Sequence, residues 1–167
     1  MSALRSPTAI LTEVFVPGAA ERRRGYRTAL HRHGLETGAL IIPGGLTEDD
    51  GAAAARTLLG TAEAPTAVIV FNDRCATGVL DVLRLSGREV PGDVSVVGFD
   101  DSRLARLSHI DLTTIAQDAA AMTELAVARA VARLEGTASE REQVVAPRLV
   151  VRGTTAPPST GPELTPS

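Results

Sequence analysis

Polar side chains that could bind a ligand follow two apolar runs of the sequence. Asn72 and Asp73 come directly after Ala-Val-Ile-Val-Phe, and Asp100 and Asp101 come after Val-Ser-Val-Val-Gly-Phe. A carboxylate can accept hydrogen bonds from two adjacent hydroxyls, at about 1.5–3 kcal/mol for each charge-assisted bond. The same paired carboxylates could do acid–base chemistry or bind Mg²⁺. These residues therefore predict a polar ligand site and leave its chemistry open.

Arg22 is a third candidate for the same site. It lies four residues before Tyr26 on a predicted helix, which places it on the stripe that faces the sheet. An arginine that points inward needs a hydrogen-bond acceptor. The neighbouring arginines fall on the solvated side of the helix: Arg23, Arg24 and Arg27.

Helix capping is the competing explanation for the acidic residues. Asp73 precedes a predicted helix and can accept from its first backbone N–H groups, which would leave the Asn72 amide free to face the ligand. Asp101 or Ser102 could cap a short helix over 103–107 in the same way. We therefore expect Asp73 to be the cap and Asn72 the binding residue.

The elements that position these residues alternate between β-branched runs and alanine-rich stretches. The predicted strands are 8–15, 38–42, 67–71, 94–99 and 143–151. The predicted helices are 19–33, 47–60, 74–86 and 117–135. This alternation is typical of an α/β fold with a three-layer open parallel sheet, in which ligands bind at the carboxyl ends of the strands. The third and fourth strands are almost wholly apolar, so we expect helices on both of their faces.

Composition excludes several classes of protein. All 17 basic side chains among the 167 residues are arginine, so a P-loop lysine and a Schiff-base lysine are both absent. The net charge of -3 argues against direct nucleic-acid binding. Cys75 is the one cysteine and the three histidines have no ligand spacing, so we expect no disulfide, metal site or cofactor.

Length and patterning predict one domain with a short segment before it. Residues 1–7 form that segment, 8–152 the α/β domain and 153–167, rich in proline, a disordered tail. The sequence has no apolar stretch that could span a membrane or act as a secretion signal, so a cytoplasmic location is expected. The helix at 117–135 is the odd element, because its apolar stripe needs a partner surface: Ala126, Val127, Ala130, Val131 and Leu134.

Longer motifs carry a resemblance to a known family. The stretch 65–73 and the run Val-Pro-Gly-Asp-Val-Ser-Val-Val-Gly-Phe-Asp-Asp at 90–101 resemble the effector-binding core of LacI/GalR transcriptional regulators. Further matches are Arg22-x-x-Gly25-Tyr26, 112–115 and 149–157. The resemblance covers about residues 8 to 157 and starts after the family's helix-turn-helix, so the chain itself is not expected to bind operator DNA.

The resemblance implies a periplasmic-binding-protein-like (type I) C-terminal subdomain. In that family a small effector, a carbohydrate or a nucleoside-like molecule, binds between two subdomains. Its contacts match Arg22, Asn72 and Asp100 here, while Leu46 stands where the family has an aromatic residue that stacks on the ligand. The helix at 117–135 would belong to the second subdomain, which is incomplete in this chain.

The resemblance also implies a homodimer. The family uses the helix at 74–86 in its subunit contact, and four of its apolar residues cannot all face one sheet. The predicted dimer contacts are Ala76, Val79, Leu80 and Leu83.

Three functions compete at this point. The leading hypothesis is the effector-binding and dimerisation domain of a LacI-type repressor, without catalysis. The second is a stand-alone or transport-type sugar-binding protein. The third is an α/β enzyme that uses Asp100 and Asp101, which the missing lysine disfavours.

Overall fold

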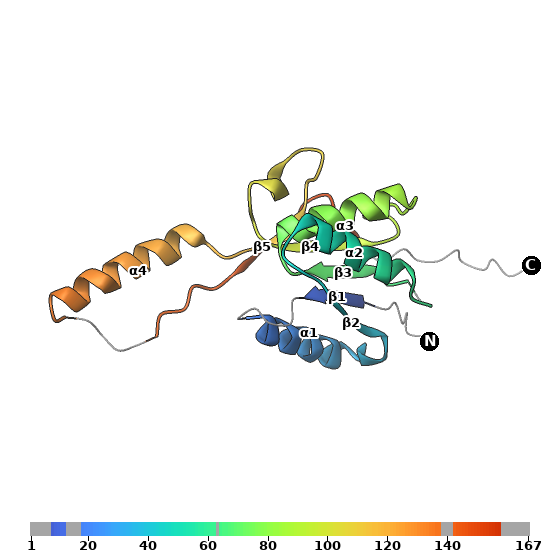
Figure 1. The fold of residues 1–167 in the computed structure, drawn as a ribbon. Coiled ribbons are helices and arrows are strands. Elements are labelled where there is room, and N and C mark those ends of the chain that lie inside the picture. The colour runs from blue at the N-terminus through green and yellow to red at the C-terminus, as the bar shows by residue number, and fades with distance from the viewer. Residues whose placement is uncertain (1–7, 13–17, 63, 138–141, 158–167) are drawn as a thin grey trace, which may run out of the picture.

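The structure, a computed structural model, describes residues 8–12, 18–62, 64–137 and 142–157 (Figure 1). Its strands are β1 (Thr8–Thr12), β2 (Ala39–Pro43), β3 (Ala67–Val70), β4 (Ser95–Asp100), β5 (Thr113–Ala116) and β6 (Arg148–Val150). Its helices are α1 (Ala19–His33), α2 (Glu48–Leu59), α3 (Asp73–Leu85) and α4 (Ala119–Leu134), with short 3₁₀ turns η1 (Glu36–Gly38) and η2 (Leu104–Arg106). No helix in this part of the chain is long and apolar enough to cross a membrane.

The sheet confirms the predicted α/β class. Its strand order is β2-β1-β3-β4-β5-β6, and the first five strands run parallel. The order reverses between β1 and β3, which is where open α/β sheets bind ligands. Sequence reasoning missed β5, whose four residues lack the continuous apolar run that marks β3. The predicted strand at 143–151 shortens to β6, which pairs antiparallel with β5 as the chain returns from α4.

One face of the sheet is covered by α2 and α3, which hold the main core (Figure 1). Two glycines let these helices touch through their backbones. A Cβ atom on Gly78 would lie 1.9 Å from the Glu48 carbonyl oxygen, and one on Gly51 would lie 2.0 Å from that of Cys75. The N-terminal halves of α2 and α3 are therefore held tightly together, beside the ends of the strands.

The apolar side of α3 is buried in this core. The residues predicted as dimer contacts are all fully buried within one chain: Ala76, Val79, Leu80 and Leu83. That prediction is wrong, because α3 packs between the sheet and α2 and so buries a wider arc than a sheet alone could cover. Its outward side carries Arg74, Asp81 and Arg84 instead.

The opposite face of the sheet is only partly covered. α1 buries Tyr26 and Leu30 against Ile10 of β1. Beyond α1, Ile69 of β3 is 38% exposed, and an apolar pocket of about 270 Å³ opens between α1 and the sheet. The expectation of helices on both faces of the third and fourth strands is therefore wrong for the α1 side.

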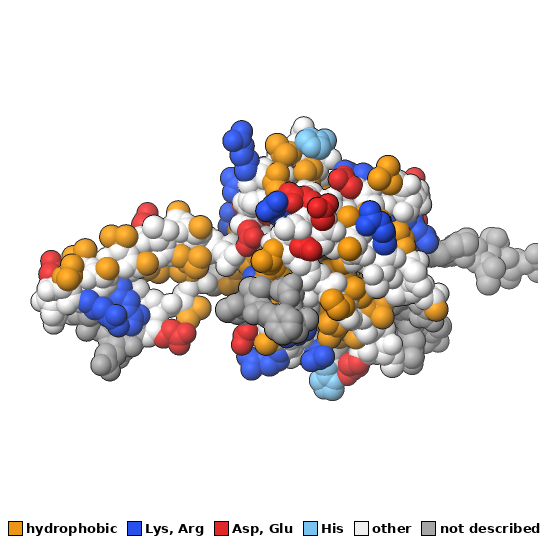
Figure 2. Space-filling view, in the orientation of Figure 1, with side chains coloured by type: hydrophobic (Ala, Val, Ile, Leu, Met, Phe, Trp, Pro, Cys, Tyr) orange, Lys and Arg blue, Asp and Glu red, His pale blue; other side chains and the backbone are white. Residues whose placement is uncertain are grey.

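α4 projects away from the sheet, as Figure 1 shows, and none of its residues is buried. Its hydrophobic side chains stay on the surface (Figure 2), with Val127 58% and Leu134 89% exposed. This agrees with the expectation that the stripe on this helix needs a partner surface.

Residues 153–157 belong to the folded part. Thr154 is 2% exposed, accepts a hydrogen bond from the Thr113 N–H at 2.9 Å and donates to the Val96 carbonyl at 2.7 Å. The prediction of a disordered tail from residue 153 is therefore wrong for this stretch, because the threonine locks it against β4 and β5. The rest of that tail, the segment 1–7 and the predicted strand end at 13–15 lie outside the described residues.

Candidate ligand-binding site

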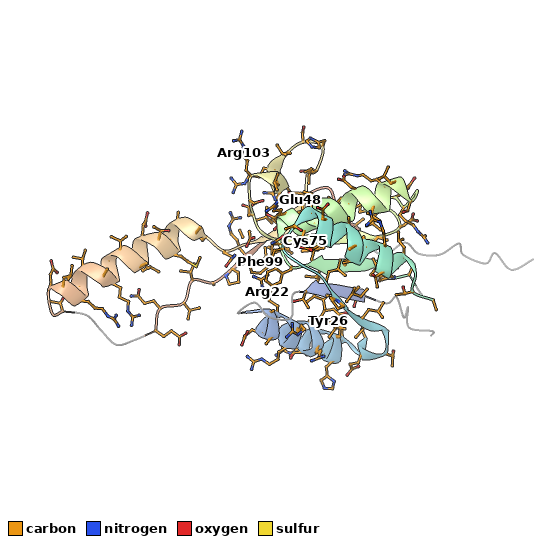
Figure 3. The ribbon with its side chains drawn as sticks, viewed as in Figure 1. Arg22, Tyr26, Glu48, Cys75, Phe99 and Arg103 are labelled. Atoms are coloured by element: carbon orange, nitrogen blue, oxygen red, sulfur yellow. The ribbon has the colours of Figure 1, made fainter. Side chains whose placement is uncertain are left out.

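The fold brings the three predicted binding residues to one edge of the sheet. Arg22 lies in the first turn of α1, Asn72 is the N-cap of α3, and Asp100 is the last residue of β4. All three stand at the carboxyl ends of the central strands, next to the reversal in strand order. Figure 3 shows Arg22 beside Phe99 at this edge.

Arg22 is held between two aromatic rings. Its guanidinium carbon lies 3.5 Å from the centre of the Phe99 ring and 4.4 Å from that of Phe71. Its Nη1 donates a hydrogen bond to the Phe71 carbonyl at 2.5 Å. Burial lowers the pKa of the Arg22 guanidinium, and the charge of Asp100 opposes that shift. Cation–π contact and the backbone acceptor thus fix the direction of this arginine before any ligand binds.

Asp100 is presented by a strained turn. Its φ is 114°, and that of Asp101 is 52°, both in the left-handed region that L-residues rarely adopt. Such conformations cost about 1–3 kcal/mol each and cluster at functional sites. One carboxylate oxygen of Asp100 accepts from the Gln117 Nε2 at 2.5 Å. Burial and the charge of Asp73 raise the pKa of Asp100, while Gln117 and Arg22 oppose the rise.

Asn72 takes the capping role that was predicted for Asp73. The Asn72 Oδ1 accepts from the Cys75 N–H at 2.7 Å, so Asn72 is the helix cap. Its Nδ2 donates to the Leu46 carbonyl at 3.2 Å, which leaves one amide hydrogen for a ligand. Asp73 is buried and bonds to the β4–η2 turn and to β5 instead. The assignment of Asp73 as the cap is wrong, because Asp73 is already one residue inside the helix.

Leu46 lies at the rim of the site, next to Asn72. Its backbone is fixed on both sides, since its N–H donates to Asp50 Oδ2 at 3.0 Å and its carbonyl accepts from Asn72. The capping box of α2, formed by Thr47 and Asp50, holds this loop in place. Its side chain is 43% exposed and offers no aromatic face.

Asp101 does not share the site with Asp100. It forms ion pairs with Arg152 at 2.6 Å and Arg106 at 2.8 Å, and η2 has no side-chain cap. Burial opposes ionisation of Asp101, but the bonds from both arginines outweigh it and hold its pKa below the ordinary value. The paired carboxylates that an enzyme or a magnesium site would need are therefore engaged separately.

Neither a metal site nor a reactive thiol is evident here. No group of three or more histidine, cysteine, aspartate or glutamate side chains within the described ranges could hold a metal ion. Cys75 is fully buried, and burial raises the pKa of its thiol to about 11. It is the small core residue that its place at a helix start predicts.

Three residues of the site were missed from the sequence. Phe71 and Phe99 sandwich Arg22, and Gln117 bonds to Asp100. Both phenylalanines stand directly before the predicted binding residues, Asn72 and Asp100, which is the signal that could have found them. Gln117 follows β5, which was not predicted as a strand.

The chain is similar in sequence to a family of known proteins. Residues 6–155 match the periplasmic binding protein-like domain family. The HTH-type transcriptional regulator reg1 of Streptomyces lividans is 40% identical over 84% of this chain and 37% of its own length. GalR of Escherichia coli strain K12 is 33% identical over 86% of this chain and 43% of its own. The chain thus spans about two fifths of the length of these curated relatives.

Solved structures give the same result. A LacI transcriptional regulator from a Rhodococcus species is 52% identical with a TM-score of 0.86, covering 90% of this chain and 56% of that one. A dimeric Lac repressor is 30% identical with a TM-score of 0.86, covering 92% and 57%. The transcriptional regulator CelR in complex with cellobiose is 35% identical with a TM-score of 0.77, covering 88% and 46%.

Proposed function

Because this chain belongs to the LacI/GalR family of transcriptional regulators, we propose that it is the effector-binding part of such a regulator and that its effector is a carbohydrate. The observation that carries the proposal is the pair Arg22 and Asp100, held at the carboxyl edge of the sheet by separate contacts. Asp100 can accept from two neighbouring hydroxyls, and Arg22 can donate to an oxygen beside them. Because the two charges are opposite, the site suits a neutral ligand with several hydroxyl groups.

The aromatic residues favour a sugar over a nucleoside. The rings of Phe71 and Phe99 both contact the Arg22 guanidinium, and Leu46 has no ring to offer. A nucleobase would gain little from stacking here, whereas a sugar can bind through its hydroxyls alone. The CelR structure, which contains cellobiose, supports the same class of ligand.

The affinity of this chain for its effector should be low. Arg22, Asn72 and Asp100 line one side of the ligand, and the rim at Leu46 is exposed. A site that surrounds a ligand on one side leaves water in competition for its hydrogen bonds. We expect a dissociation constant of about 1 mM, or about -4 kcal/mol.

Calorimetric titration with cellobiose, maltose and galactose tests the proposal. At least one sugar should bind wild-type protein, and Asp100→Asn and Arg22→Gln should each weaken that binding by about 1–3 kcal/mol. Arg88→Gln, an exposed arginine outside the site, is the matched control and should bind like wild type. If none of the sugars binds wild-type protein at millimolar concentration, the proposal fails.

We further propose a homodimer that forms through the outward side of α3. The buried side of this helix is not available, but Asp81 and Arg84 face outward and Leu85 is 88% exposed. The Lac repressor matched above is described as dimeric, which supports a subunit contact in this family. In sedimentation velocity, the Leu85→Asp variant should be monomeric under conditions in which the wild-type protein is dimeric. Unchanged sedimentation of a dimeric protein would contradict this contact.

A further inference from the structure

Asp73 is a buried carboxylate that the ligand site described above does not use. It is 1% exposed, and no ion pair among the described residues includes it. Its Oδ2 accepts from the Ser102 N–H at 2.6 Å, and its Oδ1 accepts from the Thr114 hydroxyl at 2.6 Å. Its place in the first turn of α3 adds the favourable end of the helix dipole. A buried carboxylate is costly without hydrogen-bond donors, and both oxygens of Asp73 have one.

Both hydrogen bonds reach the elements that present Asp100. Ser102 ends the strained turn that begins at Asp100, and its N–H is fixed by Asp73. Thr114 belongs to β5, and its hydroxyl oxygen also lies 3.4 Å from the Asp101 N–H. Asp73 thus links α3, the turn and β5 at one point.

The side chain of Ser102 does not replace this link. Its hydroxyl oxygen is buried and has no hydrogen-bond partner. The turn is therefore held through its backbone N–H groups and not through its own side chain.

Gly98 makes the room that Asp73 needs. A Cβ atom at Gly98 would lie 2.4 Å from the Asp73 Oδ1 and 2.8 Å from a methyl carbon of Leu112. The β4 strand therefore lacks a side chain at the point where the carboxylate passes it. The Asp73 carboxylate therefore occupies the space that a side chain at residue 98 would fill.

We propose that Asp73 is a positioning residue for Asp100: its carboxylate holds the strained turn 100–102 against β5, so that the Asp100 carboxylate stays at the ligand edge. The proposal rests on the proposed function only in treating Asp100 as a ligand contact. Two different properties should depend on Asp73, namely the order of the turn and the proton affinity of Asp100. The second follows because the charge of Asp73 raises the pKa of Asp100.

The test follows the turn and not a sugar. Amide hydrogen exchange is measured by NMR at Ser102 in wild type and in Asp73→Asn, and the Asp100 carboxyl is titrated by carbon NMR in both. Asparagine keeps the shape of aspartate but removes the charge and one of its two acceptor oxygens. We expect Ser102 to exchange at least about tenfold faster, relative to Val96 in β4, and the pKa of Asp100 to fall.

A second pair of variants keeps the test decisive if Asp73→Asn does not fold. Thr114→Val removes the hydroxyl that bridges Asp73 and the turn, whereas Thr114→Ser keeps it. Thr114→Val should speed exchange at Asp101 and Ser102, and Thr114→Ser should match wild type. Equal exchange in the two Thr114 variants would overturn the proposal.

Asp111→Asn is the control for general destabilisation. Asp111 also has a positive φ of 45°, and its carboxylate accepts from the Gly153 N–H at 2.9 Å in a different loop. It should leave Ser102 exchange and the Asp100 titration unchanged. If Asp73→Asn lowers the melting temperature but leaves both readouts at their wild-type values, Asp73 is only a folding residue and the proposal is wrong. Because no sugar is added, this failure is distinct from failure of the proposed function.

Discussion

α3 and α4 both carry several aliphatic side chains, but they are opposite in burial. α3 has 13 residues, eight of which are buried, whereas α4 has 16 residues and buries none. α3 has five valines and leucines, and α4 has four besides its seven alanines, so aliphatic content alone does not decide which helix enters a core. The difference is a matched surface: Gly78 of α3 fits against the backbone of α2, whereas no residue of α4 is buried by the described part of the chain. The stability of the sheet with its packed helices should therefore depend on α3 and hardly on α4, since isolated helices of this length are marginal in water.

Truncating one leucine in each helix should give the largest difference in the free energy of unfolding. Leu80→Ala empties a fully buried position in α3 and should lower the free energy of unfolding by about 2–5 kcal/mol. Leu134→Ala removes an 89% exposed side chain from α4 and should change it by less than about 0.5 kcal/mol. Urea denaturation of both variants measures this. Equal losses would mean that α4 is part of the cooperative unit.

Adding one methyl group tests the contact between α2 and α3. Gly78→Ala places a Cβ atom 1.9 Å from the Glu48 carbonyl oxygen, so the helices must separate, at a cost of about 1–3 kcal/mol. Gly25→Ala in α1 is the matched control, because its Cβ atom meets nothing within 4 Å. The control should gain about 0.5–1 kcal/mol from better helix propensity. A neutral Gly78→Ala would refute the tight backbone contact.

Removing the caps compares the starts of the two helices. Asn72→Ala deletes the bond to the Cys75 N–H and should lower global stability by about 1 kcal/mol. Asp118→Ala deletes the equivalent bond to the Ala121 N–H of α4 and should leave global unfolding unchanged. Thermal melts followed by circular dichroism distinguish the two. A loss in Asp118→Ala as large as that in Asn72→Ala would contradict the independence of α4.

The smallest effect on stability is expected from the charge of Asp100, beside the start of α3. Because the pKa of Asp100 is raised in the folded state, its ionised carboxylate destabilises the fold at neutral pH. Asp100→Asn should therefore be more stable than wild type at pH 7, and the difference should vanish below the ordinary value near 3.8. Denaturation at several pH values checks the sign. A variant less stable at pH 7 would show that Asp100 supports the fold instead of serving the site.

Local signals predicted the helices better than the roles of single residues. Gly34 marked the end of α1 within one residue, and the apolar run before Asn72 located β3. Whether Asn72 or Asp73 caps α3 depends on whether the helix begins at residue 73 or at residue 74. Both residue types are common helix caps, so the local sequence does not distinguish the two. The Asp101–Arg152 ion pair joins residues 51 positions apart. Such contacts follow from the packing of the whole sheet and not from any local pattern.

The dimer contacts failed for a similar reason. Ala76, Val79, Leu80 and Leu83 form an apolar stripe that a partner subunit and a neighbouring helix could satisfy equally well. The glycines that admit α2 lie at Gly51 and Gly78, and their pairing becomes visible only once the helices are in place. Arg22, in contrast, was predicted correctly to point inward, because its spacing from Tyr26 fixes its side of the helix.

A two-dimensional NMR titration with the sugar that binds best would test the ligand site at the level of single residues. We predict that the signals that shift with sugar concentration belong to Arg22, to the Phe71–Asp73 segment and to the turn 100–102, while those of α4 stay unchanged. In Asp100→Asn the same shifts should require at least about tenfold more sugar. Shifts confined to α4 or to the outward side of α3, or shifts unaffected by Asp100→Asn, would place the effector elsewhere and contradict the site described above.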